Sequence, residues 1–239
     1  MTTTPTIPRP RARRLSRDDS LPRAASVLAV TARPGQESAD LGGLLYAYRR
    51  AGADLSLLCL TRGEAAGHNS GSARLEAIRP WEVQLAASIL GIGGVAVANY
   101  RDGALDEYPT DELTKRISRA IRERSADMLL VVAPEIGDCA DASVAVAAIA
   151  AAAAAGLPAV GSTQLDARGA WTVDLGVDTE TARAIQKSAA AAHASQSEVL
   201  PALIRRLDRL GSAETLRWLL FPQQIPPQSN HQNENLVTV

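Results

Sequence analysis

The hydrophobic positions of the chain alternate between short apolar runs and longer segments with a helical period. Ser26–Thr31 has the sequence SVLAVT, and a continuous apolar run rich in β-branched residues is typical of a strand buried on both faces. Ala39–Ala51 follows, and from Leu41 its apolar residues recur at i, i+3, i+4 and i+7. This spacing places them on one face and predicts an amphipathic helix.

The same alternation continues to about residue 209. The further predicted strands are Asp54–Thr61, Val95–Tyr100, Asp127–Ala133 and Pro158–Ser162, with Ala170–Val177 as an edge strand or hairpin. The further predicted helices are Ala73–Leu90, Asp111–Arg124 capped near Thr110, Ser143–Ala155, and one or two helices over Thr179–Arg209 with a break near Pro201. Strands and helices that alternate through short loops predict an α/β fold, a Rossmann-like, doubly wound and mostly parallel sheet with helices on both faces.

The two ends of the chain differ from this middle part. Residues 1–23 are rich in Thr, Pro, Arg and Ser without a hydrophobic period, and residues 221–239 hold three prolines and a Gln/Asn-rich run. We therefore expect a disordered arm over residues 1–23, a single α/β domain over residues 24–220 and a disordered tail over residues 221–239.

Net charge and cysteine content indicate which partners and which cellular compartment to expect. The net charge of −1 gives no electrostatic reason to expect nucleic acid or a membrane as a partner. Cys59 and Cys139 are far apart in sequence and suggest no disulfide framework, which favours a cytoplasmic protein. The excess of alanine and the preference for arginine over lysine are typical of a GC-rich bacterial genome.

Polar residues gather in the loops where the predicted strands end, at the sheet edge where such folds bind ligands. The first loop has the sequence ARPGQE over Ala32–Glu37, followed by the pair Gly42 and Gly43. The later segments of this kind are Thr61–Glu64 (TRGE), Arg79 with Glu82, Asp102–Gly103, Gly137–Asp141 (GDCAD), and His193 with Ser195 and Gln196.

This series resembles the PIG-L/LmbE-like deacetylase family, zinc-dependent enzymes that remove N-acetyl groups from amino sugars. The likeness covers about residues 26–218, and it rests on the order of all six segments because each is weak alone. It implies that Arg79 and Asp102 hold sugar hydroxyls. The alternative is that these two residues shape the loops through an ion pair or a cap. For His193 the resemblance implies a structural role or a place at the rim of the site.

At the positions that bind zinc or take part in catalysis in the family, this chain has residues of other types. The resemblance places the family's metal-binding histidine, aspartate and histidine on Arg33, Gln36 and Asp141. It places the general base on Gly35 and the histidine that stabilises the oxyanion on Asp138. Arginine stays protonated and has no lone pair for a metal, and an amide is a poor ligand. We therefore predict neither a metal nor another cofactor at this site.

Other groups are expected to fill the space of the metal. Arg33 can pair with Asp138 or Asp141, because an arginine–carboxylate pair would occupy that volume. The alternative is a hard cation such as magnesium, held by these aspartates with Glu37 and Asp40. Additional arginines at the mouth of the cleft, Arg62 and Arg101, predict a preference for an anionic ligand.

Two functions of different class follow. The first hypothesis is a degenerate deacetylase-like protein that keeps a cleft for a small, amino-sugar-like or anionic molecule and lacks zinc-dependent deacetylation. Its predicted ligand-binding residues are Arg33, Gln36, Glu37, Arg62, Arg79 and Asp102. The alternative is a metal-independent enzyme of specialised metabolism in which Asp138 and Asp141 act as acid and base. An active N-acetyl hydrolase with a shifted metal site is the least favoured hypothesis, and a homo-oligomer stays open.

Overall fold

The computed structural model of the chain describes residues 21–65, 73–134, 138–163 and 170–221. The described strands form one seven-stranded sheet in the order β3-β2-β1-β4-β5-β7-β6. Neighbours among β1 to β5 are parallel, and β7 runs antiparallel to β5 and β6. The strands are β1 (Ser26–Thr31), β2 (Asp54–Thr61), β3 (Gly94–Tyr100), β4 (Met128–Val132), β5 (Ala159–Ser162), β6 (Ala170–Asp174) and β7 (Ala213–Leu220).

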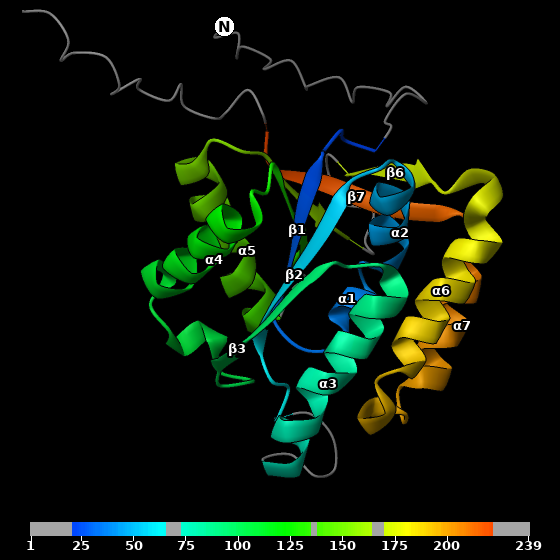
Figure 1. Cartoon of the computed structure of the whole chain (residues 1–239), viewed down its shortest axis with the longest axis horizontal. Helices are drawn as coiled ribbons and strands as arrows, with labels where there is room; N and C mark the ends of the chain where they lie inside the picture. Colours follow the sequence, from blue (N-terminus) through cyan, green and yellow to red (C-terminus); the bar gives the residue numbers. More distant parts are fainter. Residues whose placement is uncertain (1–20, 66–72, 135–137, 164–169, 222–239) are drawn as a thin grey trace, which may run out of the picture.

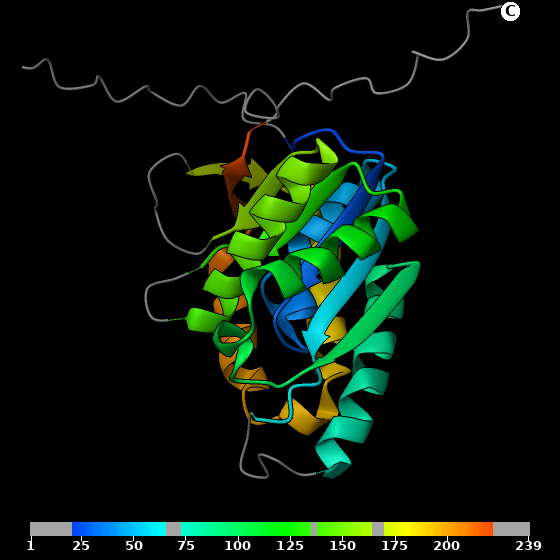
Figure 2. The same cartoon turned by 90° about the vertical axis from the view of Figure 1, so that its left-hand side faces the viewer.

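Helices cover both faces of this sheet, with α4 and α5 on one face and α2, α3 and α6 on the other (Figures 1 and 2). The described α-helices are α1 (Gln36–Ala39), α2 (Gly42–Arg50), α3 (Ala73–Leu90), α4 (Thr110–Arg124), α5 (Cys139–Ala155), α6 (Thr179–Ala191) and α7 (Leu200–Leu210). Short 3-10 turns lie at η1 (Leu105–Glu107), η2 (Gly176–Asp178) and η3 (Ala194–Gln196). The predicted α/β fold with a mostly parallel, doubly wound sheet is confirmed.

The central strand β1 shows why its sequence is apolar throughout. Val27 and Ala29 pack into the core on the side of α2, α3 and α6, whereas Leu28 and Val30 pack into the core beside α4 and α5. Successive side chains of a strand point to opposite faces, so a strand covered on both sides has no solvent-facing position. All four residues are at most 1% exposed.

Several boundaries differ from the predicted ones for local reasons. The helix predicted over Ala39–Ala51 corresponds to α2, which starts only at Gly42. The short helix α1 before it was not predicted, and Gly35 starts it with a φ of 99°, a conformation that glycine adopts without strain. Helix α5 begins one turn before Ser143, because the side chain of Asp138 accepts a hydrogen bond from the Asp141 N–H and caps the helix. The predicted cap near Thr110 is wrong, since α4 starts after Pro109 without a side-chain cap.

The C-terminal part of the domain holds the largest difference. The sequence did not predict β7, which lies inside the sheet between β5 and β6. The break between α6 and α7 spans residues 192–199, ahead of Pro201, which sits in the first turn of α7. Leu21 packs against the core, while the remainder of the predicted arm (1–20) and the tail from residue 222 lie outside the described residues. No helix within the described ranges is long and apolar enough to cross a membrane.

Candidate functional site

The site lies where the strand order reverses, between β1 and β4. From β1 the sheet continues to β2 and β3 on one side and to β4 and β5 on the other, so the loops that leave β1 and β4 diverge. A crevice at the carboxyl ends of two such strands is where open α/β sheets bind ligands. The turn that follows β1 and the first turn of α5, which follows β4, meet at this point.

Gln36 links these two segments through its side-chain amide. Its Oε1 accepts hydrogen bonds from the backbone N–H groups of Ala32 (2.9 Å) and Arg33 (3.2 Å). Its Nε2 donates to both carboxylate oxygens of Asp141, at 2.8 and 3.1 Å. Gln36 and Asp141 are each 6% exposed, so this contact is shielded from water. The amide thereby directs its donor at the carboxylate and its acceptor at the backbone.

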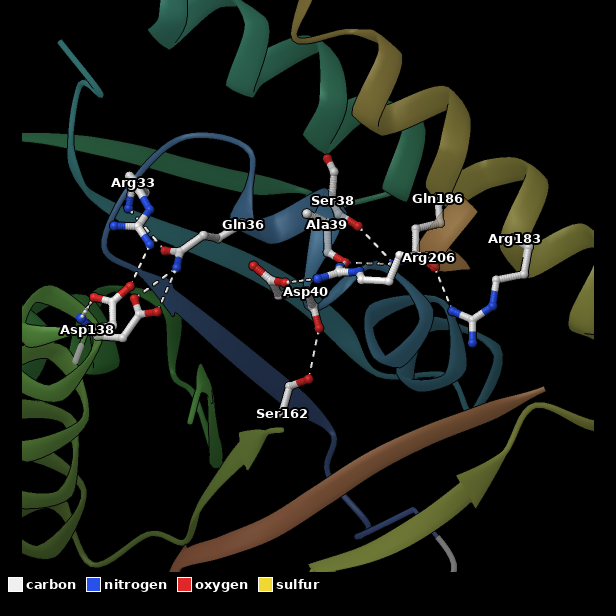
Figure 3. Close-up of polar contacts among 11 residues, drawn as sticks. Arg33, Gln36, Ser38, Ala39, Asp40, Asp138, Ser162, Arg183, Gln186 and Arg206 are labelled. Atoms are coloured by element: carbon white, nitrogen blue, oxygen red, sulfur yellow. Dashed lines mark hydrogen bonds and ion pairs between the residues drawn. The ribbon is translucent and has the colours of Figure 1, made fainter. Parts of the chain in front are cut away.

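Arg33 forms the second link between the same segments (Figure 3). Its Nη2 donates to Oδ2 of Asp138 at 2.7 Å, and the two side chains are 39% and 28% exposed. We expected Arg33 to pair with Asp138 or Asp141, and the structure shows that its partner is Asp138. Its other oxygen, Oδ1, caps helix α5 at the backbone N–H of Asp141, 3.0 Å away.

The two aspartates have opposite electrostatic environments. Burial raises the pKa of Asp141 to about 6, the hydrogen bond from Gln36 acts in the other direction, and the charge of Asp138 adds to the increase. For Asp138, burial alone would raise the pKa, but the Asp141 N–H and the Arg33 guanidinium hold it below its ordinary value. One carboxyl group therefore titrates close to neutral pH while its neighbour stays ionised.

Glu37 points away from this crevice into the protein. It is fully buried, and its Oε1 lies 2.5 Å from Nε2 of His193 and accepts a hydrogen bond from the Ser38 hydroxyl. Its Oε2 accepts a hydrogen bond from the Gly35 N–H at 2.9 Å. Because both carboxylate oxygens are bonded inside the protein, Glu37 supports the turn and joins it to the segment after α6.

Arg79 is also inside the protein, at 2% exposure. Its Nε donates to the Ser195 hydroxyl at 3.2 Å. Ser195 in turn donates from its hydroxyl and its backbone N–H to Glu82, both at 2.7 Å. This cluster fastens α3 to η3, which favours the loop-shaping interpretation of Arg79. A ligand contact by Arg79 stays a prediction.

The remaining predicted site residues lie on the β2 and β3 loops. Asp102 accepts hydrogen bonds from the Thr61 hydroxyl (3.3 Å) and the Ala65 N–H (3.0 Å), which ties the two loops together. Arg62 lies 3.5 Å from a carboxylate oxygen of Glu76. Arg101 pairs with Glu107 in the following turn. Two of the arginines expected at the mouth therefore have acidic partners of their own.

The opposite side of the turn is fixed by residues that the sequence analysis missed (Figure 3). Gln186 of α6 donates to the carbonyl oxygens of Ser38 (2.9 Å) and Ala39 (3.3 Å). Arg183, one turn earlier, donates to Gln186 and forms a buried ion pair with Glu214 of β7. Two polar residues at i and i+3 on the buried face of an otherwise Ala-rich helix were the signal that could have indicated this anchor.

A second pair of contacts reaches the turn from α7 and β5. Arg206 pairs with Asp40 at 3.0 Å and also donates to the Ala39 carbonyl oxygen. The hydroxyl of Ser162 donates to the Asp40 carbonyl oxygen at 2.8 Å. Together with Gln186, these groups hold the backbone of residues 38–40, as Figure 3 shows.

The residues at the three positions of the family's zinc ligands do not fit that metal. Arg33 presents a cation, and the Gln36 oxygen already accepts two backbone N–H groups. Asp141 is left as one carboxylate, whereas a catalytic zinc needs about three protein ligands and an open position. Within the described ranges no group of three His, Cys, Asp or Glu side chains is arranged to hold a metal ion.

A cavity of about 240 Å³ opens beside this crevice, between the turn after β1 and the C-terminal helices. Arg33, Gln36 and His193 line it, together with residues of α7. Arg62, Arg79 and Asp102 are not among the residues that line it. The structure therefore brings Arg33 and Gln36 to a common cavity and separates them from the other predicted ligand-binding residues.

Comparison with known proteins gives one family. A family model described as PIG-L, GlcNAc-PI de-N-acetylase, matches residues 28–153, just over half of the chain. Among curated proteins, the probable N-acetyl-alpha-D-glucosaminyl L-malate deacetylase 2 of Bacillus anthracis is 33% identical over 113 residues, which is 45% of this chain. The match spans half of that relative's length (50%).

Solved structures share the fold at lower identity. The N,N'-diacetylchitobiose deacetylase of Pyrococcus horikoshii, in complex with an inhibitor, has a TM-score of 0.67 and 19% identity, over 87% of this chain and 88% of that one. The 4-carboxy-2-hydroxymuconate hydratase of Pseudomonas putida KT2440 has a TM-score of 0.63 and 16% identity, over 89% of this chain and 99% of that one. Proteins described as a deacetylase and a hydratase are thus both similar to this chain in fold.

Proposed function

This chain belongs to the PIG-L family, and on that premise we propose that it binds a small molecule at the switch point of the sheet without zinc-dependent deacetylation. The observation that carries the proposal is the amide of Gln36, whose donor faces Asp141 and whose acceptor is taken by backbone N–H groups. A zinc ion would have to displace both sets of bonds and sit beside the Arg33 cation, which repels it. Two of the side chains at ligand positions, Gln36 and Asp141, bond to each other instead, and the third, Arg33, bonds to Asp138.

The ligand in this proposal is a small anionic or amino-sugar-like molecule. Arg33 supports this, because its guanidinium is partly exposed and has N–H donors beyond the one that binds Asp138. One protein that shares the fold is described as an N,N'-diacetylchitobiose deacetylase, so its named substrate is an N-acetylated amino sugar. For this chain the ligand class is a proposal, since identity this low establishes only the fold.

The decisive experiment measures metal and activity in parallel. We expect the full chain, purified without chelators and incubated with zinc, to hold no stoichiometric zinc and to release no acetate from N-acetylglucosamine conjugates. A variant with the family's residues restored (Arg33→His, Gly35→Asp, Gln36→Asp, Asp138→His, Asp141→His) is expected to bind zinc. The matched control carries only Gly35→Asp and Asp138→His, which leaves the three ligand positions unchanged. Stoichiometric zinc in the parent, with acetate release that a chelator abolishes, would refute the proposal.

The second candidate is a metal-independent enzyme, and one observation favours it. The pKa values of Asp141 and Asp138 are shifted in opposite directions, with that of Asp141 at about 6. Neighbouring carboxyl groups whose pKa values are separated in this way are suited to act as an acid and a base near neutral pH. In this proposal Asp141 transfers the proton while Arg33 stabilises negative charge on the substrate.

This second candidate has its own test. N-acyl amino sugars and unsaturated carboxylates are incubated with the chain in excess chelator, and hydrolysis or hydration is followed by mass spectrometry. We expect any turnover to fall by about 10²-fold or more in Asp141→Asn, the usual contribution of a general acid or base. Turnover that survives Asp141→Asn undiminished would exclude this role for the residue.

A further inference from the structure

The cavity beside the switch point has two chemically different walls. The polar wall is formed by residues of the turn after β1 and of the segment after α6, among them Arg33, Gln36 and Gln196. The apolar wall is formed by the first turn of α7, with Val199, Leu200 and Leu203 as its large residues. Pockets that bind small molecules are mostly apolar and carry a few polar groups that fix orientation.

The apolar wall leaves aliphatic surface open to water. Val199 is 60% exposed, Leu200 and Leu203 are half-buried, and the helical bond from the Leu203 N–H to the Val199 carbonyl (3.1 Å) puts these two residues one above the other. In contrast, Leu207 on the same helix is fully buried. The helix thus packs on the protein through its later turns and presents its first turn to the cavity. An aliphatic chain lying there would remove that surface from water, at roughly 25 cal/mol per Å².

The polar wall offers one cation with bonding capacity to spare. Of the five N–H donors of Arg33, one binds a described residue, Asp138, and the side chain is 39% exposed. Several other polar groups on this wall have internal partners, whereas Nδ1 of the buried His193 has none within the described residues. Asp40 pairs with Arg206, and the amide of Gln196 donates to the Pro34 carbonyl oxygen at 3.2 Å. Among the described lining residues, Arg33 combines a permanent positive charge with spare N–H donors, so it is the group best suited to bind a carboxylate.

From these two walls we infer that the cavity binds a medium-chain aliphatic carboxylate, of about six to eight carbons. The carboxylate lies on Arg33, and the chain lies along Val199, Leu200 and Leu203. The cavity volume of about 240 Å³ leaves room for an aliphatic chain beside the carboxylate. The inference rests on the proposed function and deepens it, because it names the class of ligand that a cleft without zinc would hold.

The test is a chain-length series measured by isothermal titration calorimetry on the full chain at pH 7. Butanoate, hexanoate and octanoate are the probes, and 1-octanol serves as the uncharged analogue of octanoate. We expect the affinity to rise about fourfold for each added CH₂ group, which corresponds to about 0.8 kcal/mol. Octanoate is expected to bind more tightly than octanol. An affinity that is independent of chain length, or equal for octanoate and octanol, would overturn the inference.

Variants locate the binding. Ala190 lines the cavity and Ala191, its neighbour on α6, is exposed, so Ala190→Leu fills the cavity while Ala191→Leu is the matched control. We expect octanoate binding to be lost in Ala190→Leu and unchanged in Ala191→Leu. Leu203→Ala and Ile204→Ala give a second pair that does not depend on Ala190→Leu folding, with weaker binding expected only in Leu203→Ala. Binding that persists in both cavity variants would contradict the site.

The result of the octanoate experiments can be distinguished from the result of the zinc test of the proposed function. Zinc in the parent chain would overturn the proposed function, whatever the octanoate series shows. A zinc-free chain that fails to bind octanoate would leave the proposed function standing and overturn only the ligand class. Arg33→Gln distinguishes the two walls, because it is expected to remove the preference for octanoate over octanol and to leave the dependence on chain length.

Discussion

The turn after β1 is held from two sides in different ways. On the side of α6 and α7, Gln186 and Arg206 bind backbone carbonyl oxygens of the turn, and the Arg183–Glu214 pair behind them is buried at 7% exposure for each side chain. On the side of α5, Arg33 and Gln36 bind the side chains of two aspartates across the crevice, and the backbone N–H groups that Gln36 also binds belong to the turn itself. Contacts to the backbone fix the path of the chain, whereas side-chain pairs can be exchanged for other pairs. Side chains on the α5 side of the turn can therefore be replaced by other residue types while the fold stays the same.

The largest effect is expected from breaking the α6 side. Arg183→Leu leaves the Glu214 carboxylate buried without its partner, and it also removes hydrogen bonds to the carbonyl oxygens of Gly211 and Ala213. Loss of one member of a buried ion pair costs about 3 to 5 kcal/mol in unfolding free energy. Urea unfolding followed by circular dichroism measures the loss. The control Arg205→Leu, on the exposed side of α7, is expected to change stability by no more than about 0.5 kcal/mol.

Gly43→Ala tests the same side by overpacking. A Cβ atom at Gly43 would lie 1.9 Å from Oε1 of Glu214, so the buried pair would have to move. Such crowding destabilises by about 1 to 3 kcal/mol. At Gly93 the nearest atom would be 3.9 Å from the new Cβ, so Gly93→Ala is expected to unfold at the same urea concentration as the parent or a higher one. Equal losses for the two variants would remove crowding as the cause.

On the α5 side, Asp141 is expected to reduce stability at neutral pH. Its pKa is about 6 in the folded chain against an ordinary value of 3.8, so between these values the folded state binds more protons than the unfolded state. Stability from this group is then present below about pH 4 and is lost as the pH rises through 6, by about 3 kcal/mol. Asp141→Asn should match the parent at pH 4 and exceed it at pH 7. An exposed carboxylate, in Asp106→Asn, serves as the control in urea unfolding at both pH values.

The smallest effect is expected for the Arg33–Asp138 pair. Both side chains are partly exposed, and such pairs contribute about 0.2 to 1 kcal/mol. A double-mutant cycle with Arg33→Ala and Asp138→Asn measures the coupling, which should decrease in 1 M salt. A coupling as large as the loss in Arg183→Leu would remove the difference between the two sides of the turn.

The fold could be predicted from the sequence because its signal is carried by the apolar pattern. The continuous run of β1 indicates a strand covered on both faces, and the glycine pair at Gly42 and Gly43 keeps the spacing of the family. Strand β7 escaped prediction because its apolar residues are interrupted by Glu214 and Arg217. Its Glu214 is buried only because Arg183 neutralises it from a helix about thirty residues earlier.

The site could be predicted in part. The meeting of the β1 and β4 loops follows from the topology, and with it an aspartate partner for Arg33. The sequence left open which aspartate this is, and it did not predict the contact of Gln36 with Asp141. The inward orientation of Glu37 and Arg79 could not be predicted, because both depend on η3 packing against α1 and α3. Neither could the cavity, since its apolar wall belongs to α7, far along the chain.

The position of β7 has a consequence for the order in which the molecule is made. A ribosome releases the parallel strands β1 to β5 first, and β7 can pair with β5 and β6 only when residues 213–220 have emerged. Until then Arg183 of α6 lacks its partner Glu214. We expect the nascent chain to present an open sheet edge at β5 until its last strand arrives, so that this edge of the sheet is completed last.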